Sequence, residues 1–323
     1  MPRRVVASLL AVLLLVAGGT AGQAKGLRHR AAAAVGRPSI LGISHVALRV
    51  SNVAASLSFY EDFLGYRALS GTAGTARPLE HTLIAVNERQ YIELSPGLAA
   101  DEDRLDHIAF ETDDVDAARR HLASRGVGVP EHATSNPAGN RSFAVTDPEG
   151  HAIEFVVQPR DAWPRVEVAR PGRSAISRRI LHAGILVGDL SAATRFYGDI
   201  LGFGEIWRGS RSGTELSWTN MKVPDGGDYV EFMLYAERPA PTARGSQHHI
   251  CLEVPDAEDA RARLLARPHR ASYARPLEVR VGTNRRRQLN LFDPDGTRVE
   301  LMEPHTVDGQ PVPSSTAPPP RRP

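Results

Sequence analysis

Hydrophobic and polar positions first indicate a strand followed by a helix near the start of the folded part of the chain. Residues 43–50 predict a strand, because the even-numbered positions from 46 to 50 are all apolar and would share one face. Residues 53–64 predict a helix with an apolar face, and Gly65 follows where a left-handed helix end is favoured. A strand that leads directly into an amphipathic helix is therefore the first structural unit.

The same order of elements returns three more times, and this repetition is the most informative feature of the sequence. The other strand and helix pairs are 106–110 with 115–125, 181–187 with 191–201, and 249–252 with 257–267. Each unit opens with a His on its first strand and closes with a Glu on its last. The pairs, separated by 48, 47, 49 and 51 residues, are His45 and Glu93, His107 and Glu154, His182 and Glu231, and His249 and Glu300.

Strand periodicity predicts which face of each sheet carries these side chains. His45 lies opposite the apolar positions of its strand, and His107, His249 and Glu154 lie opposite the apolar positions of theirs. Because the apolar face must pack on the helix, the His and Glu side chains are expected on the open face. The same alignment selects His249, and not His248, as the repeated residue.

Two turns are expected to fix the register of the closing Glu residues. Residues 147–150 and 293–296 are Asp-Pro-Glu-Gly and Asp-Pro-Asp-Gly, which is a type I turn pattern. In both units the Glu follows four residues after the Gly. A turn that sets the register of a hairpin also sets the face on which a side chain lies.

Composition and charge narrow the class of protein. A chain of 323 residues can form two ordinary domains. Its 39 basic and 37 acidic residues give a net charge of +2, so no global basic field favours nucleic acid. The basic run 285–287 is interpreted as a solvated loop. Cys251 is the only cysteine, which excludes a disulfide within the chain.

Both ends of the chain are predicted to lie outside the domains. Arg3 and Arg4 precede an apolar run over residues 5–17 and then small residues, which is typical of a secretory signal over residues 1–24. We therefore expect a secreted or periplasmic protein with no stable membrane insertion after processing; an uncleaved N-terminal membrane anchor is the alternative. The Pro-rich residues 305–323 predict a disordered tail.

The repeat resembles the vicinal oxygen chelate superfamily, which includes glyoxalases, extradiol dioxygenases, bleomycin- and fosfomycin-resistance proteins and some epimerases. His45, Phe59-Tyr60 and Leu64-Gly65 of the first unit, and His182, Phe196-Tyr197 and Leu201-Gly202 of the third, look like the glyoxalase opening motif, with departures at Tyr66 and Ala183. The resemblance implies an α+β fold of four βαβββ modules that pair into two cupped, mixed-sheet domains. We expect these domains over residues 40–158 and 178–304, with a linker over 159–177.

The resemblance also implies a divalent metal at the centre of each cup. By position, the implied ligands are His45, Glu93, His107 and Glu154 in the first domain, and His182, Glu231, His249 and Glu300 in the second. Two imidazoles and two carboxylates suit Ni, Co, Mn, Fe or Zn. Such a metal can chelate two adjacent oxygens of a small-molecule substrate, and Glu300 and Glu231 are the candidate catalytic residues for proton transfer. An oligomer is compatible with the family.

Three functions follow from the resemblance. A metal-dependent lyase or isomerase of the glyoxalase kind is favoured, because both ligand sets are complete. An Fe(II) extradiol-type dioxygenase is the first alternative, but those enzymes carry a His and a Tyr shortly before the final Glu, and residues 281–292 and 140–145 contain neither. A protein that binds a small molecule without turnover is the second alternative. Trp207 and Trp218 are expected in the hydrophobic core, although they could instead form an aromatic wall.

The N-terminal pattern makes a direct prediction about the mature protein. Its first residue should follow Gly22 or Ala24 closely, because the small residues there resemble a signal cleavage site. Mass analysis of the N-terminus of protein from the producing cells measures this. Soluble cytosolic protein that still begins at Met1 would contradict the interpretation.

Overall fold

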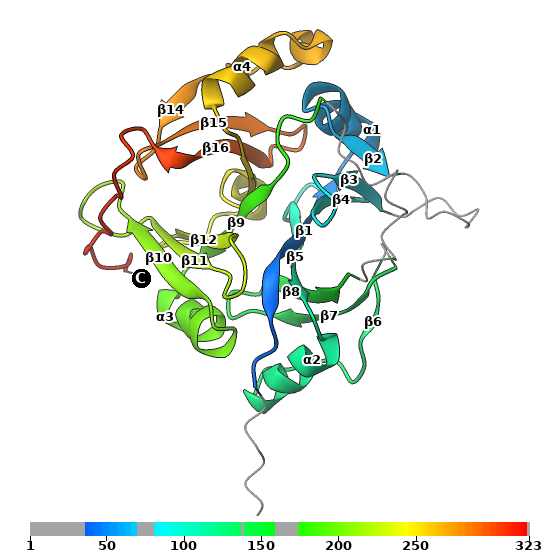
Figure 1. Cartoon of the computed structure of the whole chain (residues 1–323), viewed down its shortest axis with the longest axis vertical. Helices are drawn as coiled ribbons and strands as arrows, with labels where there is room; N and C mark the ends of the chain where they lie inside the picture. The colour runs from blue at the N-terminus through cyan, green and yellow to red at the C-terminus, as the bar shows by residue number, and fades with distance from the viewer. Residues whose placement is uncertain (1–35, 70–80, 137–138, 159–173, 322–323) are drawn as a thin grey trace, which may run out of the picture. The chain divides into compact units, whose positions relative to one another are not determined.

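The computed structural model describes most of the chain outside its N-terminal segment. The described residues are 36–69, 81–136, 139–158 and 174–321. The predicted signal segment and most of the predicted linker lie outside these residues. In the described part, the chain forms two separate eight-stranded sheets, with an α-helix after the first strand of each module (Figure 1).

The first sheet contains two modules of the same order, strand, helix and three strands. Its elements are β1 (Ile40–Val50), α1 (Val53–Leu57), η1 (Ser58–Phe63), β2 (Arg67–Leu69), β3 (Thr82–Ala85), β4 (Tyr91–Pro96), β5 (Leu105–Thr112), α2 (Val115–Ser124), β6 (Thr134–Ser135), β7 (Arg141–Thr146) and β8 (Ala152–Val157). The strand order is β2-β3-β4-β1-β5-β8-β7-β6. The first strands of the two modules, β1 and β5, are therefore the antiparallel centre of the sheet.

The second sheet repeats this arrangement. Its elements are β9 (Ile180–Val187), α3 (Leu190–Thr194), η2 (Arg195–Ile200), β10 (Gly204–Gly209), β11 (Trp218–Lys222), β12 (Tyr229–Leu234), η3 (Pro241–Ser246), β13 (His249–Glu253), α4 (Ala257–Leu265), η4 (Pro268–Ser272), β14 (Val279–Val281), β15 (Arg286–Phe292) and β16 (Arg298–Thr306). The order β10-β11-β12-β9-β13-β16-β15-β14 again places the two first strands, β9 and β13, at the centre. The predicted α+β architecture of four βαβββ modules is confirmed.

Among the described residues, the four helices α1, α2, α3 and α4 all begin with a side-chain cap of the same kind. The side chains of Asn52, Asp114, Asp189 and Asp256 each accept a hydrogen bond from the backbone N–H three residues later, at 2.8–3.1 Å. This bond satisfies one of the donors that a helix start leaves without a partner. The shared cap shows that the repeat extends to the way each helix begins.

The helices of the first and third modules widen after their first turns, which the sequence pattern did not indicate. The N–H of Leu64 donates to the carbonyl of Phe59, and that of Leu201 to Phe196, so each bond spans five residues and not four. The π-helical turn lets the adjacent residues Phe59 and Tyr60 both be buried. The predicted helices are therefore present, but their second halves differ in geometry.

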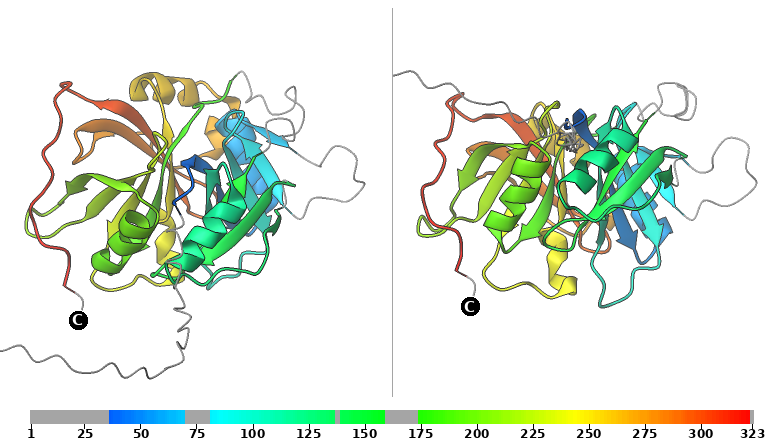
Figure 2. Two further views of the ribbon diagram at one scale, coloured as in Figure 1. Left: turned by 60° about the horizontal axis from the view of Figure 1, so that its bottom comes forward. Right: turned by 90° about the horizontal axis from the view of Figure 1, so that it is seen from below.

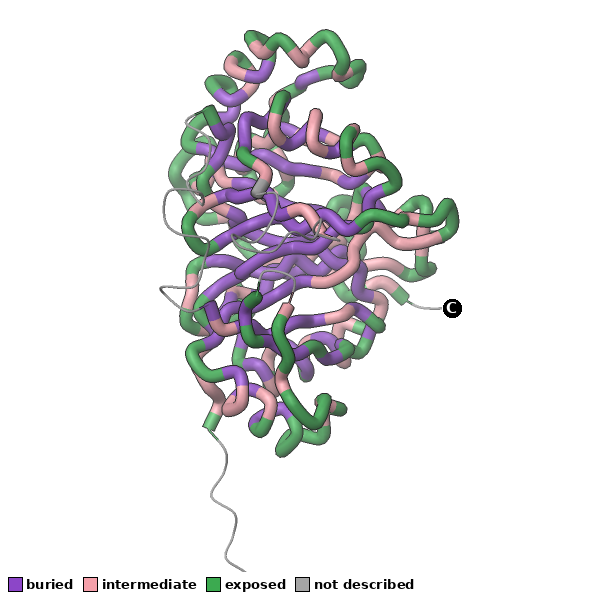
Figure 3. Tube along the Cα trace, turned by 90° about the vertical axis from the view of Figure 1, so that its right-hand side faces the viewer, coloured by how far each residue is buried: buried purple, intermediate pink, exposed green. Residues whose placement is uncertain are grey.

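The strand faces divide as the periodicity predicted. Val46, Leu48, Ile108 and Phe110 belong to one buried core that continues through both domains. Figure 3 shows that the buried residues concentrate in the strands, whereas much of the helix and loop surface is exposed. The His and Glu side chains lie on the opposite face, so the apolar face packs away from them.

Each domain inserts the turn between its last two strands against the other domain. In the first domain, Asp147 accepts a hydrogen bond from the hydroxyl of Tyr197 at 3.0 Å, and Glu149 accepts from the N–H groups of Gly188 and Asp189 at 2.9 and 2.7 Å. These are the Asp and Glu of the first Asp-Pro-Glu-Gly turn. The turn that sets hairpin register therefore also joins the two domains. Figure 2 shows the first domain in blue to green and the second in light green to red.

The second turn makes the reciprocal contact. Asp293 lies 3.5 Å from the hydroxyl of Tyr60, and Asp295 accepts from the N–H of Ser51 at 3.0 Å. Each turn thus contacts the residues just before the first α-helix of the other domain. It also contacts a buried Tyr, Tyr197 or Tyr60, in the π-helical turn that continues this helix. Because each domain supplies one turn and one helix, the two docking contacts are equivalent.

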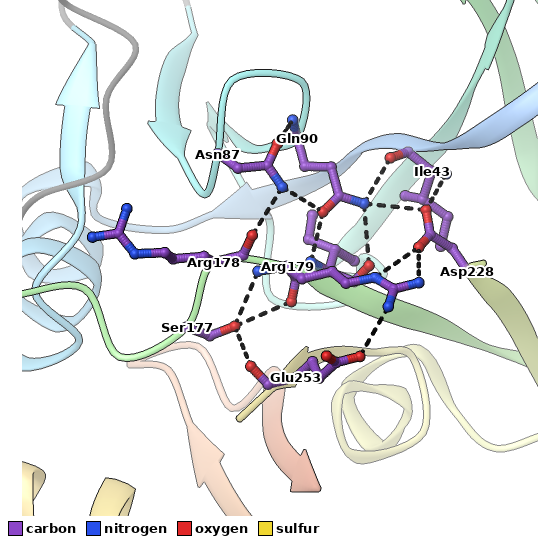
Figure 4. Close-up of polar contacts among 9 residues, drawn as sticks. Ile43, Asn87, Gln90, Ser177, Arg178, Arg179, Asp228 and Glu253 are labelled. Carbon is purple, nitrogen blue, oxygen red and sulfur yellow. Dashed lines mark hydrogen bonds and ion pairs between the residues drawn. The ribbon is translucent and has the colours of Figure 1, made fainter. Parts of the chain in front are cut away.

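A buried polar network between the two sheets adds a third contact (Figure 4). The side chain of Gln90 donates to the carbonyls of Ile43 and Ile180 at 3.0 and 3.1 Å, and its oxygen accepts from the N–H of Ile180 at 2.8 Å. Asp228 accepts from the N–H of Ile43 and from Arg179, each at 3.0 Å. Gln90 therefore hydrogen-bonds to the backbone of both domains.

The C-terminal segment after β16 has no helix or strand among its described residues. Its backbone nevertheless contacts the second domain, since the carbonyl of Pro318 accepts from the N–H of Leu216 at 2.8 Å and the N–H of Ser315 donates to Arg208 at 2.9 Å. In the described part of the chain, no helix is both long and apolar enough to cross a membrane.

The two docking carboxyls should respond to pH in opposite ways. Burial raises the pKa of Asp293 to about 7, whereas hydrogen bonds to His151 outweigh burial at Asp147 and lower its pKa. The ionised Asp293 therefore destabilises the fold above about pH 7, and this cost is relieved as the pH falls towards the value of about 4 for an unfolded Asp. The ionised Asp147 stabilises the fold until the pH falls below that value.

We expect the difference in Tm between Asp293→Asn and the parent chain to become more positive from pH 5 to pH 8. Asp147→Asn should be destabilised over this whole range, by roughly 1–3 kcal/mol, because a buried charge-assisted contact is lost. Thermal unfolding at pH 5, 6, 7 and 8 measures both. A parallel pH dependence of the two variants would contradict the assignment of the two pKa shifts.

Candidate metal centres

The central strands bring the predicted histidines of each domain together. In the first domain Ala47 pairs with His107 and His45 with Ala109, so the two imidazoles lie on neighbouring positions of the antiparallel pair. Their Nε2 atoms are 3.0 Å apart. In the second domain the Nε2 atoms of His182 and His249 are 2.9 Å apart. Both pairs lie on the face opposite the helices.

Parallel strands on either side bring in the glutamates. In the first centre, Nε2 of His45 lies 3.0 Å from Oε2 of Glu154 and 3.8 Å from Oε2 of Glu93. His107 lies 3.4 Å from Glu154. The four residues therefore converge on one point, although each comes from a different strand.

The second centre has nearly the same geometry. Nε2 of His182 lies 3.4 Å from Oε2 of Glu300 and 3.8 Å from Oε2 of Glu231. Nε2 of His249 shows the reverse, 3.4 Å from Glu231 and 3.8 Å from Glu300. In both domains the structure thus brings together all four residues that the sequence analysis selected.

Burial and charge of these groups fit a divalent cation. The side chains of Glu93 and Glu154 are 1% and 8% exposed, and those of Glu231 and Glu300 are 10% and 5% exposed. Two carboxylates buried together are costly unless a cation compensates them. Oε2 of Glu93 and Oε2 of Glu154 are both buried, and each faces the Nε2 atom of His45. Three ligand atoms of each centre lie within 4.8 Å of one another.

A carboxylate supports the second histidine of the first centre. Nδ1 of His107 lies 2.8 Å from Asp106, which also accepts from Arg49 at 2.8 Å. Burial alone would lower the pKa of His107, but hydrogen bonds to Asp106 and Glu154 outweigh it and raise the pKa to about 10. The Asp106 contact fixes Nδ1 as the protonated nitrogen and directs Nε2 at the centre, as in many metal-ligating histidines.

The corresponding histidine of the second centre has a different environment. Nδ1 of His249 lies 2.7 Å from the carbonyl of Gln247 and 2.8 Å from Nη2 of Arg298. Burial, and then the charge of Arg298, lower the pKa of His249 to about 4. At Glu300, hydrogen bonding to His182 and the charge of Arg298 outweigh burial and lower the pKa to about 2. His249 is therefore neutral and Glu300 ionised at neutral pH.

Gly184 gives the second centre room for its histidine. It pairs with His249, and a Cβ atom at this position would overlap the imidazole ring. The equivalent position in the first domain is Ala47, opposite His107. The imidazole of His249 is fully buried, whereas 16% of the His107 side chain is exposed. The absence of a side chain at residue 184 therefore lets His249 lie closer to the sheet.

Two residues near the first centre were not selected from the sequence. Nδ1 of His81 lies 2.8 Å from Oε1 of Glu93 and 2.8 Å from the hydroxyl of Ser95. His81 precedes β3, and only the β3–β4 register reveals its position. Asp106 is adjacent to His107 in the sequence, but strand alternation places neighbours on opposite faces, so no pattern indicated their contact.

A cavity of about 750 Å³ adjoins the second centre. Asn290, which pairs with Glu300, and Arg298, which contacts His249, both line it. Trp218 also lines the cavity, as expected for an aromatic wall. Cys251 is buried beside the centre, and burial followed by the charges of Glu300 and Glu231 raises the pKa of its thiol. A neutral thiol is a poor nucleophile and a poor metal ligand.

Family comparison agrees with this geometry. Residues 42–155 and 179–301 both match the model of the Glyoxalase/Bleomycin resistance protein/Dioxygenase superfamily. The chain belongs to this superfamily. The superfamily match covers the two sheets and all eight candidate ligands, and it confirms the predicted resemblance.

Relatives within the superfamily have several activities. The chain is 30% identical over 122 residues to the metallothiol transferase FosB of Staphylococcus epidermidis, covering 36% of this chain and 81% of FosB. It is 29% identical over 122 residues to the lactoylglutathione lyase of Haemophilus influenzae, covering 35% of this chain and 90% of the lyase.

Solved structures share the whole two-domain fold. The 2,3-dioxygenase LapB of Pseudomonas sp. KL28 superposes with a TM-score of 0.64 at 16% identity, covering 86% of this chain and 98% of LapB. The Mn(II)-bound glyoxalase of Novosphingobium aromaticivorans superposes with a TM-score of 0.59 at 18% identity, covering 86% of each chain. At these identities the likeness establishes the fold alone.

Gly184→Ala should selectively weaken the second metal centre. The new Cβ would overlap the buried ring of His249, which must then turn away from the other three ligands. We expect metal content after mild dialysis to fall from up to two per chain towards one. Gly204→Ala is the matched control, because no atom lies within 4 Å of a Cβ at that position. Metal content of Gly184→Ala equal to that of Gly204→Ala would contradict the proposed ligand role of His249.

Proposed function

We propose that the second domain is a metal-dependent lyase or isomerase of the glyoxalase kind. The observation that carries this proposal is a complete, buried set of two His and two Glu beside a cavity large enough for a small-molecule substrate. His182, Glu231, His249 and Glu300 would hold the metal; Ni, Co, Mn, Fe and Zn all suit this donor set. Bound there, the metal would supply Lewis-acid polarisation of two adjacent substrate oxygens.

Glu300 and Glu231 are the candidate groups that move a proton. Both carboxylates have lowered pKa values, because contacts to His249 and His182 outweigh burial, so both are ionised proton acceptors at neutral pH. They come from β16 and β12, which lie on opposite sides of the central strands β9 and β13. The two carboxylates can therefore act on a substrate from two sides, which suits transfer of a proton between neighbouring carbons. His249, with its pKa of about 4, remains a neutral ligand.

Residues opposite the glutamates favour this reaction over ring cleavage. Asn290 pairs with Glu300 and Asn220 with Glu231. An amide can orient a carboxylate or a substrate oxygen, but it cannot act as an acid or base near neutral pH. The strand before Glu300 thus offers no His or Tyr for an Fe(II) extradiol-type dioxygenase. The dioxygenase likeness of the fold supports that alternative only at the level of architecture.

We assign the first domain a supporting role, with a metal held by His45, Glu93, His107 and Glu154. Its equivalents of Asn220 and Asn290 are Leu83 and Ala144, which bring no polar group to the substrate side of the ligands. His81 also engages one oxygen of Glu93. A centre with fewer free polar groups is better suited to stabilising the fold than to chemistry.

We further propose that the enzyme acts outside the cytosol on a small molecule with adjacent oxygens. The support is the N-terminal sequence pattern over residues 1–24. An exported enzyme meets little of the cytosolic thiol used by glyoxalases, so we expect a different oxygen-rich substrate. The net charge of +2 gives no reason to expect a nucleic-acid partner.

Substitution of two ligands separates metal binding from proton transfer. Glu300→Gln keeps an oxygen of similar shape but removes charge and basicity, so metal content should fall modestly and turnover by about 10²-fold or more. His249→Ala should lose metal and turnover together. Glu154→Gln is the same change in the first centre; it should lower metal content with much less effect on turnover. Elemental analysis and turnover of each variant on a candidate 1,2-dioxygenated substrate measure these effects.

Oxygen dependence separates the two reaction classes. Protein reloaded with Mn, Co, Ni or Zn should turn over substrate under anaerobic conditions, because proton transfer consumes no oxygen. Strict dependence on ferrous iron and oxygen would instead establish the dioxygenase. Folded protein that holds well under one metal per chain would favour a binding protein without turnover.

A further inference from the structure

The cavity beside the second centre is lined by an unusual concentration of arginines. Arg211, Arg275, Arg280 and Arg298 line its wall, together with only two acidic residues, Glu215 and Glu278. Arg280 forms an ion pair with Glu278. Among the described residues, no carboxylate lies within ion-pair distance of Arg211, Arg275 or Arg298, so three cationic side chains in one cavity form no ion pair.

Aromatic rings hold two of these arginines in place. The guanidinium carbon of Arg211 lies 5.3 Å from the ring centre of Trp218, and that of Arg275 lies 4.3 Å from the ring centre of Phe292. Stacking of this kind fixes a planar guanidinium while it leaves the N–H donors at the edge of the plane available. Trp218 and Phe292 also line the cavity. The guanidinium groups of Arg211 and Arg275 are therefore held in place while their positive charges remain unpaired.

Arg298 links this cavity to the metal ligands. Its Nη2 and the carbonyl of Gln247 both lie within 2.8 Å of Nδ1 of His249, but one hydrogen cannot serve both contacts, because the guanidinium only donates and the carbonyl only accepts. When Nε2 is used as a ligand, a neutral imidazole carries its hydrogen on Nδ1 and donates it to Gln247. Arg298 then has no acceptor at His249, and its buried Nε has no partner among the described residues.

We propose that this cavity binds an anionic group, a carboxylate or a phosphoryl group, on the substrate of the second centre. Arg211 and Arg275 would bind the anion, and Trp218 would pack on the apolar part of the same molecule. Arginine forks match the oxygen geometry of both groups. The proposal rests on the function proposed above and specifies its substrate class: a small acid whose charged group lies beside the oxygens that face the ligands.

The first domain offers no equivalent arrangement at the corresponding positions. The residue two before the closing Glu is Arg298 in the second domain and Ala152 in the first, and Trp218 is replaced by His81. Arg298 and Trp218 therefore have no counterpart of the same type at these positions of the first domain. This difference supports the assignment of substrate binding to the second domain.

Anion binding can be tested without metal and without turnover. Isothermal titration calorimetry of the metal-free full chain should show saturable binding of phenylphosphonate or benzoate, at least about tenfold tighter than benzyl alcohol of similar size, and weakened by salt. Whichever of the two acids binds more tightly identifies the class of anion. Equal affinity for the charged and neutral probes, or no binding of either acid at millimolar concentration, would overturn the proposal.

Variants locate the binding to the cavity. Arg211→Gln combined with Arg275→Gln should weaken binding of the tighter acid by about tenfold or more, because two charge-assisted contacts are lost. Arg208→Gln is the matched control, since Arg208 lies outside the cavity and already pairs with Glu205 at 2.6 Å. An equal loss in the control would show a general effect of charge and would overturn the proposal. Circular dichroism confirms that each variant is folded.

The outcomes of this experiment and of the metal analysis are independent. Loss of metal from the purified chain would contradict the proposed function but leave the calorimetry of the metal-free protein interpretable. Absence of anion binding with two metals per chain would reject the substrate class and leave the proposed reaction intact.

Discussion

The antiparallel pairing of the first strands of two modules is the interaction on which each candidate centre depends. Pairing of β1 with β5 sets His45 opposite Ala109 and Ala47 opposite His107, which brings the two Nε2 atoms to 3.0 Å. Parallel neighbours on each side then supply the glutamates. A shift of one residue would move a histidine to the helix-packed face, where an unpaired imidazole is costly. Hydrophobic packing on one face of the sheet therefore determines the positions of the His and Glu side chains on the other face.

Sequence periodicity predicted the features that depend on local patterns. The faces of the strands follow from apolar alternation, and the repeated His and Glu positions follow from the spacing of the repeat. The pairing of modules was expected from the resemblance to the superfamily. The π-helical turns were not predictable, because they arise from the packing of adjacent aromatic residues such as Phe59 and Tyr60 in one core. The contact of His81 with Glu93 depends on hairpin register, which no local pattern in that segment reports. The docking role of the Asp-Pro-Glu-Gly turn requires knowledge of the opposite domain.

The two centres share their ligands but differ in what surrounds them. Asp106 supports His107 with a negative charge, whereas a backbone carbonyl and Arg298 surround His249. A carboxylate contact makes an imidazole a more basic ligand, and a cation beside it makes the imidazole less basic. The two candidate centres thus differ in their electrostatic surroundings, because a carboxylate adjoins the imidazole of the first and a guanidinium adjoins that of the second. Duplication of one module has produced two environments through changes at a few positions around an unchanged ligand set.

The reciprocal docking of the two turns has a consequence for how the repeat can change over time. Asp147 contacts Tyr197 of the second domain, and Asp293 approaches Tyr60 of the first. If either domain were exchanged for an unrelated partner that covered the same surface, a buried phenol and a carboxyl group would lose their hydrogen-bond partners. The stability of each domain therefore depends on the presence of the other. Because each domain stabilises the other, selection for stability alone is sufficient to retain a domain during evolution.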